Sequence, residues 1–353
     1  MVKRIAVVVS QGQSNNPVKR DMEEEIVAAL MMEPGIDVTV IPHLYDLKSD
    51  GTGMVALSGI AGNMIILSWL YERAARWVLD RNGICGHVGE SLIQHEDDDE
   101  EEAELDEDKD RVIQQREIPN RKIYCLDLQV ENSPQPYIEE VKRIASENSA
   151  EVVNLMNWVG GDATPEQLER FQNPTNDTAL AGDGTLATPD SPTEPATATR
   201  IEGEAGRRWY PVIDYSRCTN CMECIDFCLF GVYGIDTAET ILVEQPDSCR
   251  KGCPACSRVC PENAIIFPQH KSPAIAGAPV DAGALKIDLS KLFGAPEDGR
   301  SAEELAVAER DEQLLAAGRE AVGNRVGVPK RQTTAEPRDE LDDLIDQLDE
   351  LDI

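Results

Sequence analysis

Eight of the ten cysteines of this chain lie in two runs, which read Cys218-Thr-Asn-Cys221-Met-Glu-Cys224-Ile-Asp-Phe-Cys228 and Cys249-Arg-Lys-Gly-Cys253-Pro-Ala-Cys256-Ser-Arg-Val-Cys260. Each run holds three closely spaced cysteines and a fourth that follows after three further residues. Short loops of this length curl around one face of a compact inorganic cluster, whereas the fourth cysteine begins a helical turn that points toward another cluster. The repeated pattern predicts two iron–sulfur clusters.

Two other uses of cysteine are weighed against this interpretation. Disulfides need an oxidising compartment, and the opening Met1-Val-Lys-Arg-Ile5 reads as the start of a strand and not as a secretory signal. Structural zinc shares the Cys-x2-Cys spacing, but zinc sites take their cysteines as separated pairs. Here each run is a triplet plus a fourth, which favours iron–sulfur chemistry. We therefore expect a cytoplasmic protein.

Residues 207–271 resemble the bacterial two-cluster, 2[4Fe-4S] ferredoxin module. The resemblance implies a small α+β fold and an electron-carrying role. It also implies two crossed sets of ligands: Cys218, Cys221, Cys224 and Cys260 for one [4Fe-4S] cluster, and Cys249, Cys253, Cys256 and Cys228 for the other.

The chain departs from the pattern of that family in two places. Three residues, 250–252, separate the first two cysteines of the second run, where the family usually has two, and Leu229 stands where the family usually has proline. Gly252 adopts an additional bend at little cost, so we expect a distorted loop with ligation retained. Because of the longer spacing, Cys249 is the ligand that the resemblance specifies least firmly. Without Cys249 as a ligand, the second site would hold a three-iron cluster.

Residues 1–165 read as an α/β domain with three layers and a parallel sheet. Apolar, β-branched runs predict strands, and amphipathic segments between them predict helices, so that the two alternate along the chain. The expected strands are 4–10, 37–41, 63–68 and 121–127, and the expected helices are 21–32, 70–79 and 136–145. The order resembles flavodoxin-like and tetrapyrrole metal chelatase-like folds.

Two groups of residues in this domain are candidates for ligand binding. The loop Ser10–Pro17 follows the first strand, where an open α/β sheet binds ligands, and it is a candidate for the phosphate of FMN. His43 together with Cys85 and His87 is a candidate metal or tetrapyrrole site, if the fold brings them together. For the loop, the favoured interpretation is an ordinary polar turn. For the histidines and the cysteine, it is that they are unrelated surface or core residues. Cys125 is interpreted as a small buried hydrophobe.

The rest of the chain is predicted to contain little packed structure. Residues 95–111 are an acidic insertion, and residues 166–206 a flexible linker that lets the cysteine module move relative to the first domain. Residues 272–353 are expected to be a mostly disordered acidic tail, with short helices near 302–317 and 339–352. The last helix has an apolar stripe suited to a groove in a partner.

The net charge of −33 excludes some classes of function and favours others. Residues 96–110 alone hold twelve acidic residues and one lysine. Such acidity disfavours nucleic-acid binding, which needs a basic footprint, and favours redox partners with basic docking surfaces. No run of eighteen apolar residues is present, so no membrane span is expected.

Three functions are compatible with these features. The first is an electron carrier, in which Arg250 and Lys251 raise the reduction potential of the second cluster. The second is a redox enzyme or enzyme subunit whose α/β domain binds a flavin or tetrapyrrole and is served by the cysteine module. The third is an interaction protein with purely structural clusters. The sequence favours an electron carrier or oxidoreductase subunit over a stand-alone enzyme.

Removal of iron is expected to unfold the cysteine module, because a module this small has too little core to be stable without its clusters. The measurement is near-UV circular dichroism before and after anaerobic chelation. A chelated sample that keeps a native-like near-UV spectrum would contradict the prediction.

Overall fold

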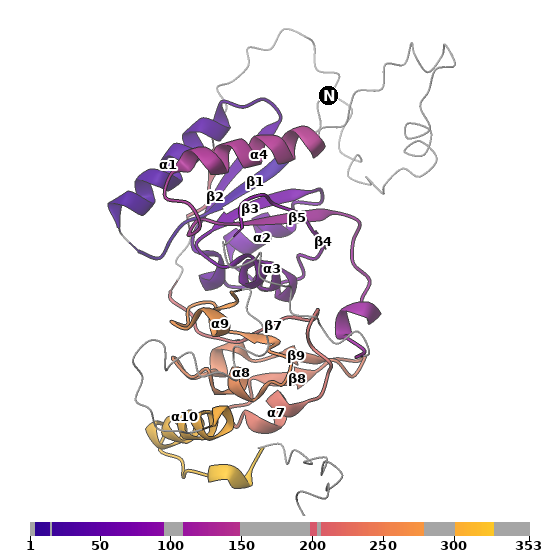
Figure 1. Cartoon of the computed structure of the whole chain (residues 1–353), viewed down its shortest axis with the longest axis vertical. Helices are drawn as coiled ribbons and strands as arrows, with labels where there is room; N and C mark the ends of the chain where they lie inside the picture. The colour runs from indigo at the N-terminus through magenta and orange to yellow at the C-terminus, as the bar shows by residue number, and fades with distance from the viewer. Residues whose placement is uncertain are drawn as a thin grey trace, which may run out of the picture.

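The computed structural model describes residues 4–14, 16–94, 109–148, 198–202, 206–278 and 301–327. Two parts lie one above the other in Figure 1. The upper part, here called the α/β unit, is built from residues 4–148 and 198–202. The lower part, here called the cysteine unit, comprises residues 206–278, and residues 301–327 lie beneath it.

The α/β unit is built on a six-stranded sheet in which every described pairing is parallel. The strand order is β4-β5-β3-β1-β2-β6. Strands β2 and β6 therefore lie on one side of β1, and β3, β5 and β4 lie on its other side. The strands are β1 (Ile5–Ser10), β2 (Ile36–Ile41), β3 (Met64–Ser68), β4 (His87–Val88), β5 (Lys122–Asp127) and β6 (Thr199–Arg200). This confirms the predicted α/β class with a parallel sheet.

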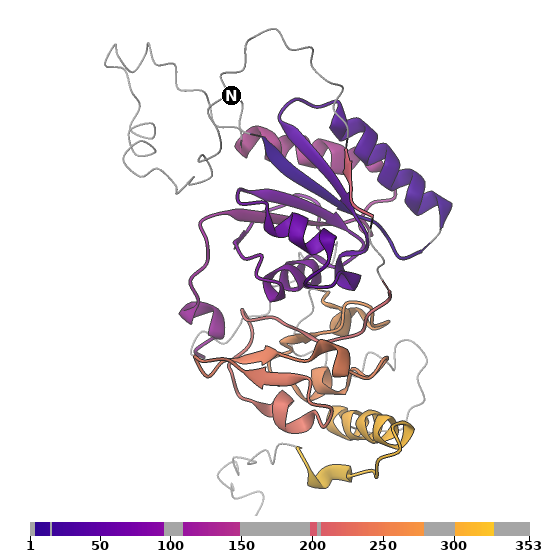
Figure 2. The same ribbon diagram turned by 180° about the vertical axis from the view of Figure 1, so that it is seen from behind.

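Helices cover both faces of the sheet, which gives the three layers expected from the sequence. One face carries α1 (Pro17–Met31) and α4 (Pro134–Asn148), and the other carries α2 (Thr52–Ser58) and α3 (Glu72–Arg81). Figure 2 shows the same arrangement from behind. Helix α1 begins four residues earlier than predicted, because Asn16 caps it by accepting a hydrogen bond from Val18 N at 3.1 Å.

Strand β6 lies in the stretch that the sequence predicts as linker. Thr199 and Arg200 pair with β2 at the edge of the sheet, and Arg200 forms a two-pronged ion pair with Glu24 on α1 at 2.9 and 2.5 Å. Residues 198–202 are therefore part of the α/β unit. The preceding part of the predicted linker, up to residue 197, lies outside the described residues.

The cysteine unit consists of two similar halves. Each half runs strand, short helix that ends at a cysteine, strand, and each antiparallel pairing joins one strand from each half. The elements are β7 (Val212–Ile213) paired with β10 (Ile265–Ile266), β8 (Tyr233–Ile235) paired with β9 (Ile241–Val243), α7 (Glu223–Phe227) and α8 (Ala255–Val259). A further short helix, α9 (Pro273–Ala276), continues the unit beyond residue 271.

One helix follows the cysteine unit in the described part of the chain. It is α10 (Ala302–Ala316), in the stretch where the sequence predicts a helix, and Ser301 and Glu304 cap its start reciprocally. The acidic stretch 95–108 and the predicted helix near 339–352 lie outside the described residues. Among the helices that the structure describes, none has the length and apolar character needed to cross a membrane.

The α/β unit and the cysteine unit share one hydrophobic core. Tyr210, Val212 and Ile266 of the cysteine unit are packed into the same buried cluster as α2 and α3. The rings of Tyr45 and Tyr210 stack with centroids 4.3 Å apart, and Trp77 meets Tyr215 edge-on at 5.7 Å. The sequence analysis expected a linker that lets the cysteine module move, and in the structure burial of these aromatic side chains packs the two units together.

Buried polar contacts reinforce this junction. Arg73 on α3 donates to Asp214 Oδ2 and to the carbonyl of Asn263, both at 2.5 Å. Asp46 accepts hydrogen bonds from the Arg208 amide at 2.9 Å and from Gln269 Nε2 at 3.1 Å. Asp46 and Asp214 are both almost fully buried, so loss of a partner would leave a buried charge uncompensated.

Substitution Tyr45→Phe tests the junction. The Tyr45 hydroxyl accepts from Tyr210 N at 2.6 Å and donates to Tyr210 O, so its removal leaves two buried backbone groups without that partner. We expect the free energy of unfolding in urea to fall by about 1–3 kcal/mol. Tyr124→Phe, which loses one half-buried bond inside the α/β unit, is the control with a smaller loss. An unchanged free energy of unfolding in Tyr45→Phe would contradict the stabilising role of this hydroxyl at the junction of the two units.

Candidate metal centre

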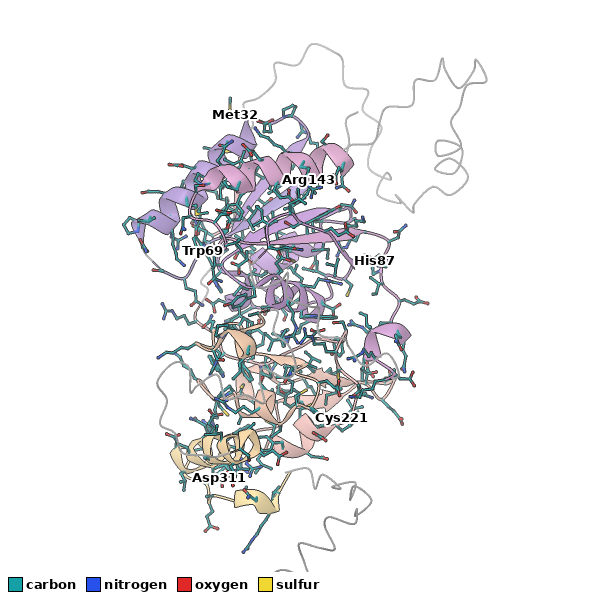
Figure 3. The ribbon with its side chains drawn as sticks, in the orientation of Figure 1. Met32, Trp69, His87, Arg143, Cys221 and Asp311 are labelled. Atoms are coloured by element: carbon teal, nitrogen blue, oxygen red, sulfur yellow. The ribbon has the colours of Figure 1, made fainter. Side chains whose placement is uncertain are left out.

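The four cysteines expected to form the first ligand set line one cavity. Cys218, Cys221 and Cys224 come from the loop that leads into α7, and Cys260 comes from the end of α8 in the other half of the unit. The cavity has a volume of about 380 Å³ and opens to solvent, and Cys221 is exposed at its rim. Figure 3 shows Cys221 on the cysteine unit.

The other four cysteines line a second cavity of about 320 Å³. Cys249, Cys253 and Cys256 come from the loop that leads into α8, and Cys228 comes from the end of α7. Phe227, Phe230 and Tyr233 form part of its wall. Each cavity is thus lined by three cysteines of one run and the last cysteine of the other run.

The short helices explain why the sets cross. Helix α7 carries Cys224 in the first cavity and ends at Cys228 in the second, and α8 carries Cys256 in the second and ends at Cys260 in the first. Four residues of helix advance about 6 Å along its axis. The two cavities are therefore neighbours, joined by these two short helices.

The backbone around the cysteines adopts unusual conformations that let the loops curl. Asn220 and Met222 lie in the left-handed region with φ of 59° and 65°. The Asn220 side chain compensates by bonding the Glu239 carbonyl at 2.8 Å and the Ile241 amide at 2.9 Å, which fastens the loop to β9. Gly252 has φ of 85°, as expected for the residue that absorbs the longer spacing in the second run.

Burial raises the pKa of the thiols that lie deepest in the two cavities. Loss of hydration raises the pKa of Cys253 to about 11 and that of Cys260 to about 12, and raises the pKa of Cys256 well above its usual value. Neighbouring cysteines raise them further. Four thiolates in such a cavity need a cationic centre, and metal binding would displace the protons.

Four cysteine side chains line each cavity. Across the residues that the structure describes, no three His, Cys, Asp or Glu side chains are grouped as ligands of a single ion.

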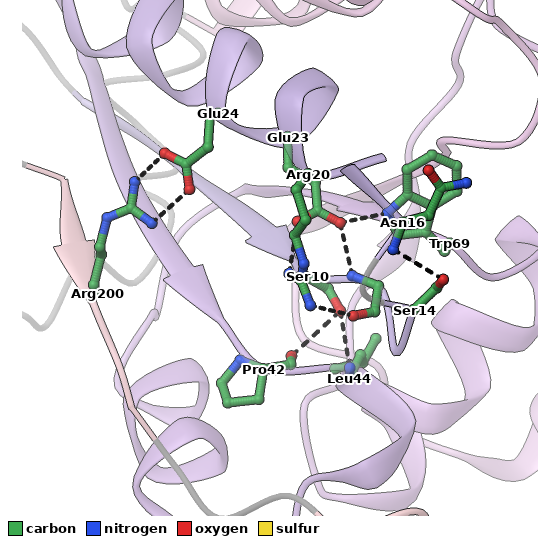
Figure 4. A network of polar contacts seen from close by, with 11 residues as sticks. Ser10, Ser14, Asn16, Arg20, Glu23, Glu24, Pro42, Leu44, Trp69 and Arg200 are labelled. Atoms are coloured by element: carbon green, nitrogen blue, oxygen red, sulfur yellow. Dashed lines mark hydrogen bonds and ion pairs between the residues drawn. The ribbon is translucent and has the colours of Figure 1, made fainter. Parts of the chain in front are cut away.

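In the loop after β1, the backbone amide of Gly12 is bound by the side-chain carboxylate of Glu23 (Figure 4). Glu23 Oε1 accepts from the Gly12 amide and from Trp69 Nε1, both at 2.7 Å, and Arg20 pairs with its other oxygen at 2.9 Å. Glu23 is only 2% exposed. The amide that would bind a flavin phosphate already binds this carboxylate, which favours the ordinary polar turn over an FMN site.

The structure does not bring the other candidate metal ligands together. His43 follows β2, whereas His87 lies in β4 at the far side of the sheet, with β1, β3 and β5 between them. His43 is buried beside Asp46, and its burial lowers its pKa to about 4. Cys85 lies near Asp80 and Arg116, and Cys125 is buried in β5.

Comparison with known proteins supports the cysteine unit alone. No protein-family model matches the chain, and no solved structure matches it. A protein of Methanocaldococcus jannaschii named uncharacterized ferredoxin is 53% identical over 66 residues, which are 18% of this chain and 44% of that protein. The pyruvate synthase subunit PorD of the same organism is 32% identical over 72 residues, which are 20% of this chain and 81% of PorD.

This chain belongs to the ferredoxin family. The membership supports an iron–sulfur electron-transfer role for the matched part of the chain. The chain spans less than half the length of the first of these relatives, and both matches leave about four fifths of this chain uncovered. The α/β unit thus remains unassigned to a family.

One residue of the second cavity escaped the sequence analysis. Arg310, on α10, lines this cavity and is only 1% exposed. It lies far along the chain from the cysteines, so their spacing gives no indication of it. The helical periodicity of α10 could have indicated this residue, because Arg310 lies on the same buried face of the helix as Ala306, Val307 and Leu314.

Proposed function

We propose that this ferredoxin-family chain is an electron-transfer protein that carries single electrons through two [4Fe-4S] clusters. The cluster of the first cavity is held by Cys218, Cys221, Cys224 and Cys260, and that of the second by Cys228, Cys249, Cys253 and Cys256. The single observation that carries the proposal is the crossed lining of two adjacent cavities by these eight side chains. A [4Fe-4S] cluster supplies a reversible one-electron couple.

Hydrogen-bond donors already point at the sulfur atoms. The Asn220 amide lies 3.5 Å from Cys218 Sγ, the Ala264 amide 3.3 Å from Cys260 Sγ, and the Tyr233 hydroxyl 3.1 Å from Cys256 Sγ. Such donors stabilise negative charge on the sulfurs and so favour the reduced state. The fold holds them in place before an electron arrives.

Charged side chains distinguish the two cavities. Glu223 and Glu262 lie on the wall of the first, and Arg250 and Arg310 on the wall of the second. Lys109 pairs with Glu262 at 2.8 Å, which reduces the effect of that carboxylate. Since a reduced cluster is more negative, the cationic wall favours reduction in the second cavity.

The exchange of electrons with a partner is assigned to the first cavity. Cys221 is exposed there, and so are the nearby Asp226 and Glu239. An acidic rim fits a redox protein with a basic docking surface, which it would attract at long range. The relative PorD is named as a subunit of pyruvate synthase, so an oxidoreductase is the proposed kind of partner.

Substitution Cys249→Ala is expected to convert the second cluster to a three-iron form. Cys249 would hold one iron corner, and that corner is lost with its thiolate. Iron analysis and the EPR spectrum of the oxidised protein measure the change. Cys85→Ala, which removes a cysteine outside both cavities, is the matched control and should keep the wild-type spectrum. An unchanged second cluster in Cys249→Ala would remove Cys249 from the ligand set.

A redox titration followed by EPR tests the function. We expect dithionite to reduce both clusters, with the second at the higher potential because of its cationic wall. The Cys249→Ala variant identifies the second cluster, since only its step in the titration should change. Clusters that dithionite cannot reduce would contradict electron carriage, and the reverse order of potentials would contradict the charge argument.

A further inference from the structure

Residues 301–327, here called the cover segment, lie against the second cavity. Helix α10 packs on α8 at the bottom of the cysteine unit, and a short 3₁₀ turn, η6 (Gly323–Arg325), follows it (Figure 1). Ala306 and Val307 are buried in the same hydrophobic cluster as Cys253 and Cys256. The segment is thus part of the core around this cavity.

Contacts on both halves of the cysteine unit hold the cover segment in place. Glu309 forms a two-pronged ion pair with Arg258 on α8, with both distances 3.0 Å. Arg319 donates to the carbonyl of Leu229, just after Cys228, at 2.8 Å. Gly327 has φ of 67° and lies so close to the end of α7 that a Cβ atom there would meet backbone atoms of Asp226 and Phe227.

Arg310 is the buried cation of this segment. Its guanidinium donates to the carbonyls of Gly323 at 2.7 Å and Val326 at 2.8 Å, which folds the end of the segment back against α10. The same group lies 4.4 Å from the centre of the Phe227 ring, next to Cys228. Arg310 therefore joins the fold of the segment to the wall of the cavity.

A buried guanidinium is costly unless negative charge faces it. Asp311 lies 3.3 Å from Arg310 Nε, but it is absent from the cavity wall and also binds the Gly323 amide at 2.7 Å. Neutral backbone carbonyls take the other two nitrogens. A cluster ligated by four thiolates carries net negative charge and would supply the remaining compensation.

We infer that the cover segment is a built-in lid over the second cavity and that Arg310 is the residue that raises the reduction potential of the centre held there. The inference rests on the proposed function, because the effect requires a cluster in that cavity. Arg250 and Lys251, which the sequence singled out for this role, are exposed, so water and salt screen them far more than Arg310.

Substitution Arg310→Gln in the full chain tests the electrostatic part. We expect the reduction equilibrium of the second cluster to fall about tenfold, a shift of about 59 mV for one electron, with the first cluster unchanged. Arg325→Gln, an exposed arginine on the same segment, is the matched control with no shift. Arg310→Lys, which keeps the charge, should stay near the wild-type potential.

Substitution Gly327→Val tests the lid without altering Arg310 or a cysteine. Its Cβ would collide with the backbone at Asp226, so the end of the segment should detach. We expect an iron chelator to remove the second cluster several-fold faster, with the first cluster lost at the wild-type rate. This variant decides the lid part of the inference even if Arg310→Gln fails to assemble the second cluster, and Arg310→Lys then decides the electrostatic part, since a potential well below that of the wild type would overturn it.

Different results would contradict the proposed function and the inference about the cover segment. Wild-type protein without iron and sulfide would remove the proposed function. Wild-type protein with both clusters, but with an unchanged second potential in Arg310→Gln, would overturn the role of Arg310. A wild-type rate of cluster loss in Gly327→Val would overturn the lid.

Discussion

A single turn of helix separates Cys224 from Cys228, and another separates Cys256 from Cys260, so each half of the cysteine unit sends its last sulfur into the cavity of the other half. Neither cavity is complete without both halves. The surrounding structure supports this arrangement of the cysteines. Residues with a positive φ let the cysteine loops curl, and the two antiparallel strand pairs hold the ends of the loops. Burial raises the pKa of thiols such as that of Cys260, and metal binding would displace their protons.

The two cavities differ in their surroundings although the halves that build them are similar. The first has Glu223 and Glu262 on its wall and the exposed Cys221, whereas Arg250 and Arg310 lie on the wall of the second. The α/β unit packs against the cysteine unit through Tyr45 and Tyr210.

Local patterns in the sequence were sufficient for the features that depend on near neighbours in the chain. The resemblance to the two-cluster ferredoxin module implied the two sets of four cysteines that line the two cavities, and the apolar runs predicted the parallel sheet. Features set by distant contacts were missed. Thr199 and Arg200 become a strand only because the edge of β2 and Glu24 receive them, and Arg310 reaches the cavity only because α10 packs on α8. The shared core at Tyr210 likewise depends on a surface of α3 that the sequence does not reveal.

The central claim is that each crossed set of four cysteines holds a four-iron cluster. The most direct test is to purify the full chain anaerobically and to count iron and acid-labile sulfide per chain. The account predicts about eight of each. One or two zinc ions per chain with no sulfide, or a colourless protein that cannot be reconstituted with iron and sulfide, would contradict it.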